Sequence, residues 1–188
     1  GLLLSGICHS YGQQAKISEP FEPYTESAEI EIWLKGAQPG KARLYSVFGN
    51  QNLIKDSATS DAEGKVVFKN SRRYPSGFYY AVYDGNTSFL GFLLDKNQKI
   101  YMHADKSDII HTMKTNSAEN KLFFESQVYE TELAKKMESI TTNLSKTIAG
   151  AAEHTAFMKE QKKLVEEKEM VVKGYVEKYP TSFFAIFK

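Results

Sequence analysis

Cysteine is almost absent from this sequence. Cys8 is the only one among 188 residues, so the chain cannot close a disulfide within itself and cannot carry a Cys-x-x-Cys redox pair. An excess of one charge is also lacking, because 24 Lys and Arg residues face 23 Asp and Glu residues and leave a net charge of +1. No basic stripe is interleaved with aromatic residues, so we expect no nucleic-acid partner.

Long apolar runs are scarce, and after the first residues no stretch approaches the ~20 residues that span a bilayer as a helix. Residues 1–12 resemble the end of a secretory signal peptide, with an apolar run followed by small residues that suit cleavage. Gln13 would then begin the mature chain. A lipid anchor on Cys8 is an alternative, although Ile7 stands where such signals place a small residue. In a third alternative the segment stays and folds. We predict an exported protein, periplasmic or associated with the outer membrane.

Short strand-forming runs fill the chain between residues 28 and 115, after an extended lead-in at 13–27. Within 28–34 apolar residues alternate with polar ones, which indicates a half-buried strand with Trp33 on its outer side. The other predicted strands lie at 43–48, 53–59, 66–68, 78–83, 89–94 and 99–105. A short closing strand is predicted at 109–113. Such strands at hairpin spacing are typical of a β-sandwich or a barrel.

The stretch from Gly77 to Asp105 has the clearest pattern. Asp84-Gly85 tolerates the positive φ of a tight turn, and the segment Asp95–Gln98 indicates a second, longer turn. We therefore predict a three-stranded antiparallel meander. Its strands are apolar on both faces, whereas a sheet with one wet face alternates apolar and polar residues. A second sheet, a helix or a partner is expected to cover the second face.

The pattern becomes helical after residue 115. The segment that begins at Asn116 matches a capping box, in which Asn116 accepts from the first turn and Glu119 reaches back. Apolar residues then recur at three- and four-residue steps from Leu122 to Ile148. A second helical pattern runs over 153–179. It is expected to end there because the residue before Pro180 disfavours helical angles.

Together these elements predict an α+β fold: an antiparallel β-sandwich or barrel-like domain at 28–115, followed by a helical segment with a hairpin at 116–188. Thr181 can cap a third, short helix that is rich in phenylalanine. An aromatic segment of this kind is seldom left bare in water. We therefore expect the chain to continue after Lys188 into a further domain.

One group of residues has the side-chain types of a metal site: His103, Asp105, Asp108 and His111. Zinc accepts imidazole and carboxylate ligands. The same residues also suit a strand followed by a turn, and a metal site requires that they converge on one point. We favour the second interpretation and predict no metal and no other cofactor.

Four aromatic residues, Trp33, Tyr79, Tyr83 and Tyr101, are candidates for a platform that binds a sugar or a peptide, since amphipathic rings are common binding anchors. They serve equally well as a packing surface beneath the helices, and we favour burial over ligand binding. The sequence contains neither a nucleophile elbow nor a phosphate-binding loop. We predict no catalytic residue, so that the chain by itself is not an enzyme.

Several short segments follow one another in a familiar order and spacing, and they are Leu44-Tyr45, Asp56–Thr59, Gly64–Phe68, Pro75–Tyr79, Phe92–Gln98, Asp105–Asp108, Ser117–Phe123 and Tyr179–Ala185. Through them the chain from Ala28 to Lys188 resembles the N-terminal region of exported thioredoxin-like proteins of Gram-negative bacteria, thiol-disulfide interchange proteins of the cytochrome c maturation kind. In that family a β-domain of uncharacterised function and a helical segment precede a thioredoxin domain.

The resemblance implies that the redox chemistry belongs to a Cys-x-x-Cys domain, and no position of this chain matches that motif. No catalytic residue is therefore carried over. The implied function is a non-catalytic accessory module that positions a protein or peptide substrate, or a partner, for a C-terminal thioredoxin-like domain in cis. The alternative is a binding protein that holds a small ligand, glycan or peptide in an aromatic groove between sheet and helices. A homo-oligomer is compatible with either function.

Overall fold

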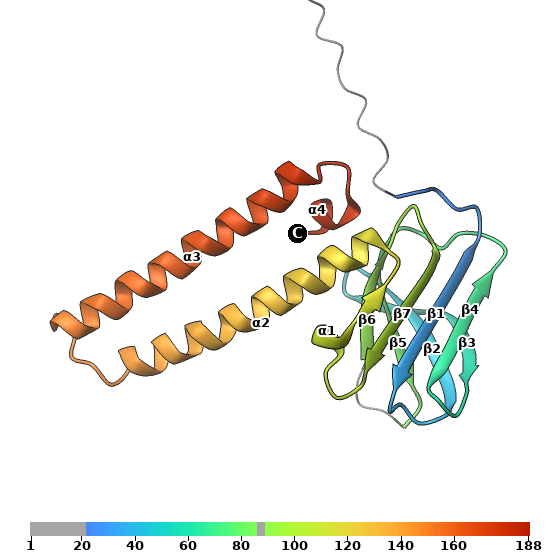
Figure 1. The fold of residues 1–188 in the computed structure, drawn as a ribbon, viewed down its shortest axis with the longest axis horizontal. Coiled ribbons are helices and arrows are strands. Elements are labelled where there is room, and N and C mark those ends of the chain that lie inside the picture. Colours follow the sequence, from blue (N-terminus) through green and yellow to red (C-terminus); the bar gives the residue numbers. More distant parts are fainter. Residues whose placement is uncertain (1–21, 86–88) are drawn as a thin grey trace, which may run out of the picture.

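The computed structural model describes residues 22–85 and 89–188. The predicted signal-peptide remnant, the cleavage before Gln13 and the lipid anchor on Cys8 lie outside the described residues. The fold is α+β, with a β-sandwich at one end and a long helical hairpin that projects from it (Figure 1). No described helix is long and apolar enough to cross a membrane.

The sandwich has two four-stranded sheets, neither of which closes into a barrel. Sheet A has the order β4 (Lys65–Asn70), β1 (Ala28–Lys35), β7 (Lys99–Asp105) and β8 (Lys114–Thr115). Sheet B has the order β3 (Gln51–Ser60), β2 (Gly40–Phe48), β5 (Gly77–Tyr83) and β6 (Phe89–Leu94). All pairs are antiparallel except β1 and β7, which run parallel.

The core lies between the sheets and follows the predicted alternation. Ala28, Ile30, Ile32 and Leu34 of β1 are buried, and the residues between them face outward. Because side chains alternate along a strand, one face of each sheet supplies the core and the other remains available for helices or solvent.

The predicted three-stranded meander is wrong, because β7 leaves sheet B after the β5–β6 hairpin and joins sheet A. The buried side chain of Gln98 supports this crossing. Its Nε2 donates to the carbonyl oxygen of Tyr74 at 2.8 Å, and its Oε1 accepts from the Tyr74 N–H at 2.8 Å. The Arg73 guanidinium donates to the carbonyl oxygens of Asp95 and Lys96. These bonds give partners to backbone groups of the 95–98 connection and of the segment before β5.

The predicted closing strand at 109–113 is a helical turn instead, α1 (Ile109–Thr112). Asp108 caps it, with a side-chain oxygen that accepts from the N–H of His111. The chain then makes the two-residue strand β8 at the edge of sheet A. The local cap therefore outweighs the weak strand pattern.

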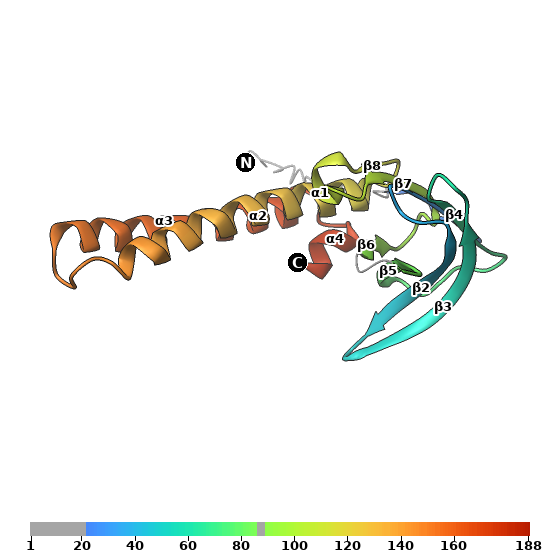
Figure 2. The ribbon, with the colours of Figure 1, turned by 90° about the horizontal axis from the view of Figure 1, so that it is seen from below.

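The helical hairpin consists of α2 (Ala118–Leu144) and α3 (Ala152–Lys178), and α4 (Phe183–Phe187) follows it. The cap of α2 is Ser117 and not Asn116, and the cap of α4 is Ser182 and not Thr181. Beyond their packing on the sandwich, α2 and α3 project as an arm, while α4 lies back beside sheet B (Figure 2).

The outer face of sheet B is covered in part. Phe78 and Leu93 pack into a cluster with Phe123 of α2 and Phe184 of α4. Further along the same face Phe89 is 58% exposed. The expected cover over the second face of β5 and β6 is thus present at one end of the strands and absent at the other.

Candidate functional site

The outer face of sheet A carries the candidate site. In the parallel register of β1 and β7, Trp33 lies beside His103 and Lys35 beside Asp105. These residues alternate with the buried core positions of both strands, so their side chains share the outer face. The backbone pairing therefore brings together two segments that are far apart in the sequence.

An aromatic row crosses this face. The rings of Trp33 and His103 meet edge to face with centroids 5.3 Å apart, and the rings of His103 and Tyr101 lie 4.8 Å apart. The indole N–H of Trp33 donates to the carbonyl oxygen of Glu63 at 2.9 Å, which fixes the orientation of the ring. The row presents flat, partly exposed rings of the kind that bind sugars and peptides.

Glu31 orders the polar side of the row. One of its carboxylate oxygens lies 2.7 Å from Nε2 of His103, and the other lies 2.9 Å from Nζ of Lys65. The Lys65 ammonium, and after it His103, holds the pKa of Glu31 below its ordinary value. Glu31 is therefore ionised at neutral pH and keeps the imidazole of His103 in place.

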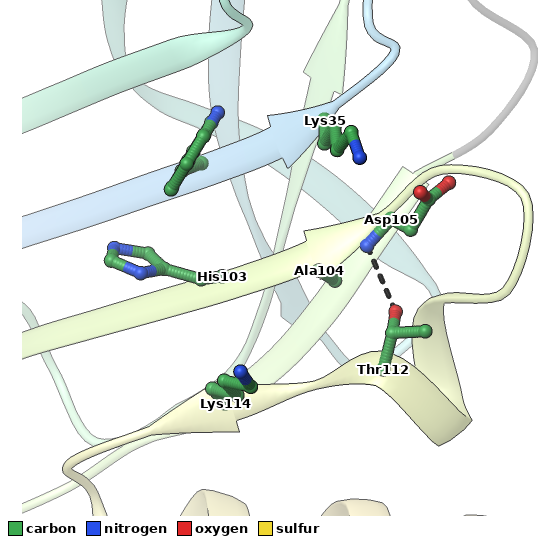
Figure 3. Close-up of a pocket in the computed structure, with 7 residues that line it drawn as sticks. Lys35, His103, Ala104, Asp105, Thr112 and Lys114 are labelled. Atoms are coloured by element: carbon green, nitrogen blue, oxygen red, sulfur yellow. Dashed lines mark hydrogen bonds between the residues drawn. The ribbon is translucent and has the colours of Figure 1, made fainter.

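A groove of about 220 Å³ lies at the Trp33 and His103 end of the row, and its lining residues are Trp33, Lys35, His103, Ala104, Asp105, Thr112 and Lys114. Lys35 and Asp105 lie toward one end and His103 toward the other (Figure 3). The N–H of Asp105 donates to Oγ1 of Thr112 at 2.8 Å, which joins α1 to the floor. Neither Lys35 nor Lys114 forms an ion pair with another residue of the described parts of the chain. The groove thus combines flat rings with two ammonium groups and the carboxylate of Asp105.

The structure does not bring the four predicted aromatic residues together. Tyr79 and Tyr83 are buried between the sheets, where their hydroxyls donate to the carbonyl oxygens of Pro75 and Gly64. Burial raises the pKa of Tyr79 to about 12 and raises that of Tyr83 as well. Only Trp33 and Tyr101 lie together on the open face of sheet A. Because both faces of β5 are apolar, its sequence does not show which tyrosines point inward.

The residues with metal-ligand types do not converge. His103 pairs with Glu31, the Asp105 carboxylate accepts from Ser107, and Asp108 lies 2.8 Å from Nδ1 of His111 within α1. Among residues 22–85 and 89–188 no three His, Cys, Asp or Glu side chains are grouped as metal ligands.

Sequence reasoning missed the lysines of the groove and a pair of buried carboxylates where the arm meets the sandwich. Glu119 is 2% exposed, and its two oxygens accept from the N–H groups of Phe183 and Phe184 at 2.8 and 2.7 Å. Glu22 accepts from the hydroxyl of Ser117 at 2.9 Å and from the Glu119 N–H at 3.2 Å. Burial raises the pKa of both carboxyl groups. A glutamate at the start of a helix suggests a capping box. The sequence pattern therefore assigned Glu119 to its own helix and gave no sign of its contact with Phe183 and Phe184.

Comparison with known proteins leaves the family open. No family model matches the chain, and no curated protein does. Among solved structures, the crystal structure of (S)-allantoin synthase is similar over 43% of this chain and 39% of that chain, with 11% sequence identity and a TM-score of 0.30. Nothing about function follows from a similarity at this level.

Proposed function

We propose that this chain is the non-catalytic accessory module of an exported thioredoxin-like thiol-disulfide oxidoreductase, and that it positions a substrate or partner for a separate redox domain in cis. The order of segments between Ala28 and Lys188 supports the choice of family. The way in which α4 is attached to the rest of the chain supports the positioning role.

The observation that carries this role is the contact between Glu119 and α4. Both oxygens of one buried carboxylate accept from the first N–H groups of α4, and the ring of Phe187 stacks on Phe78 of β5 with centroids 6.0 Å apart. The chain thus travels out along the arm and returns to the sandwich. A domain attached after α4 would be held close to the sandwich in a defined orientation, as positioning requires.

The proposal is tested on the full-length protein. The reading frame after Lys188 is expected to encode a Cys-x-x-Cys domain. The full protein and its isolated redox domain are then compared in reducing a disulfide-bonded protein and a small aromatic disulfide. We expect a lower KM for the protein substrate when the module is present and equal kinetics for the small disulfide. A reading frame without such a domain, or equal KM values for the protein substrate, contradicts the proposal.

A second candidate function is ligand binding in the groove of sheet A, and the exposed row of Trp33, His103 and Tyr101 favours it. Trp33 is the only tryptophan, so its fluorescence reports on this groove alone. Titration with glucose, glucuronate and trialanine should change the emission for at least one of them, most strongly for glucuronate because of Lys35 and Lys114. His103→Ala, which removes a ring that lines the groove, should weaken that response. Unchanged emission with all three ligands argues against this function.

A further inference from the structure

The projecting arm has too little core of its own. Between residue 127 and the end of α3 at Lys178, the buried residues are Ile140 and Leu164. Helices in water gain most of their stability by burying one face, and two helices of about 40 Å each, with so few buried positions, lack that contribution. Part of the arm surface is therefore expected to become buried against another molecule.

One face of the arm has an apolar groove that is suited to this burial. It consists of two adjoining hollows of about 460 and 520 Å³, which share Met137 and Val165. The hollow nearer the sandwich adds Leu133, Ala134 and Leu164, and the hollow nearer the tip adds Met158. Val165, at the middle of the groove, is 46% exposed.

The two ends of the groove differ in charge. The tip end is lined by Lys159 and Lys162 and by no carboxylate, whereas the sandwich end is lined by Glu130 and Glu169 together with Lys168. Two of these groups have partners within the chain: Nζ of Lys162 lies 3.8 Å from Glu166, and Glu130 accepts from Lys188 at 2.7 Å. Glu169 and Lys159 form no ion pair with other residues of the described segments.

We propose that the arm is a homodimer interface, in which a second copy of this chain docks its own arm antiparallel in the groove to form a four-helix bundle. A two-fold axis near Met137 and Val165 places the lysine end of each groove against the carboxylate end of the other. A parallel arrangement would instead set the lysines of the two tips side by side. The antiparallel pairing is self-complementary, as an isologous interface must be.

The length of the arm accommodates this arrangement. The start of α3 at Ala152 lies 13 residues, or about 20 Å, from Val165, and the same distance in the other direction reaches the end of α3 at Lys178. Two antiparallel arms that pair about Val165 therefore overlap along the whole of α3. This dimer does not depend on the presence of a redox domain.

Analytical ultracentrifugation of the full chain tests the proposal, with Val165→Glu as the disrupting variant and Met170→Glu as the matched control. Met170 lies on another face of the same helix, is 73% exposed and lines neither hollow. We expect a dimer for the wild type, a dimer for Met170→Glu, and a dimer Kd at least about tenfold weaker for Val165→Glu. A monomeric wild type, or equal effects of the two variants, would overturn the proposal.

Charge exchange tests the antiparallel orientation. Lys162→Glu and Glu169→Lys are each expected to weaken the dimer, and the double variant is expected to recover it, because the two groups face each other across the interface. Circular dichroism of each variant checks that helicity is retained. Additive losses in the double variant would overturn the orientation, and binding of a different protein by a monomeric chain would overturn the dimer.

Discussion

Glu119 is the residue on which the junction of arm and sandwich depends. Its carboxylate is buried and accepts from backbone N–H groups, and no cation accompanies it in the described contacts. Burial is the main cause of its raised pKa, and the nearby carboxyl groups of Glu22 and Asp95 add to it. The native state therefore holds a proton on Glu119 more tightly than the unfolded chain does.

This imbalance predicts how stability depends on pH. Between the unfolded pKa, ordinarily 4.5, and the raised native pKa, the native state binds more protons, so the contribution of Glu119 to the free energy of unfolding falls as pH rises. We expect the difference in unfolding free energy, wild type minus Glu119→Gln, to decrease from about pH 4 to pH 7. Urea titrations at several pH values measure it, and a difference that grows with pH contradicts the assignment.

Adding a single methyl group at Gly64 should lower the free energy of unfolding strongly. Its φ is +83°, and a Cβ there would lie 2.3 Å from the carbonyl oxygen of Leu34. Gly85 has a similar φ of +74° but open space around the same position. The Gly85→Ala variant should lose about 1 kcal/mol from left-handed strain, and Gly64→Ala clearly more, because the backbone of β1 must move. Chemical denaturation compares the two, and equal losses would show that the close contact does not matter.

At the scale of elements, asparagine side chains close two strand edges. Asn116 accepts from the Tyr101 N–H at 2.9 Å and donates to the Lys99 carbonyl at 3.1 Å on β7. Asn120 accepts from the N–H of Leu93 on β6 at 2.8 Å and donates to the carbonyl oxygen of the same residue at 2.9 Å. Asn120 thus takes the place of a neighbouring strand at the edge of sheet B, and Asn116 continues along β7 the short pairing of β8, which protects both strands from pairing with other chains.

The two asparagines differ in burial, and this difference yields a prediction. Asn120 is buried, so Asn120→Ala leaves both backbone groups of Leu93 without a partner and should cost about 2 kcal/mol. Asn116 is exposed, so water can replace it and Asn116→Ala should cost about 0.5 kcal/mol. Unfolding free energies of the two variants decide the matter, and the reverse ranking would contradict the role assigned to Asn120.

At the scale of the whole molecule, the sandwich and the arm differ in how much core each has. The sandwich encloses one continuous cluster of buried residues, whereas the arm beyond its base has only Ile140 and Leu164. Regions with few buried apolar contacts open at lower free energy than the rest of a protein. The arm is therefore the weaker part of the chain whenever its groove is unoccupied.

The Val165→Glu variant should reveal this difference in unfolding. Trp33 lies in the sandwich and is the only tryptophan, so its fluorescence follows the sheets, while far-ultraviolet circular dichroism is dominated by the helices. We expect the helical signal to decline at a lower urea concentration than the fluorescence, because the isolated arm melts first. Coincident transitions would show instead that arm and sandwich unfold as one unit.

Much of the fold follows from local patterns. Alternation located β1, the Asp-Gly turn located the β5–β6 hairpin, and Pro180 marked the region where α3 ends. The candidate site was less accessible. Trp33 lies on the outer side of β1 as predicted, but its neighbours come from β7 and α1, which no local pattern connects to it. The lysines of the groove have no sequence signature at all.

The sequence by itself determined the segments that form strands and helices, because turn residues, caps and periodicity act within a few positions of the chain. Only the tertiary structure decided that β7 pairs with β1 in sheet A, that Tyr79 and Tyr83 point into the core, and that Glu119 holds α4. These outcomes depend on which distant surfaces bury the most apolar area while every buried polar group keeps a partner. Strands that are apolar on both faces satisfy the local pattern equally well in either sheet, so the free energy of the assembled sandwich makes the choice.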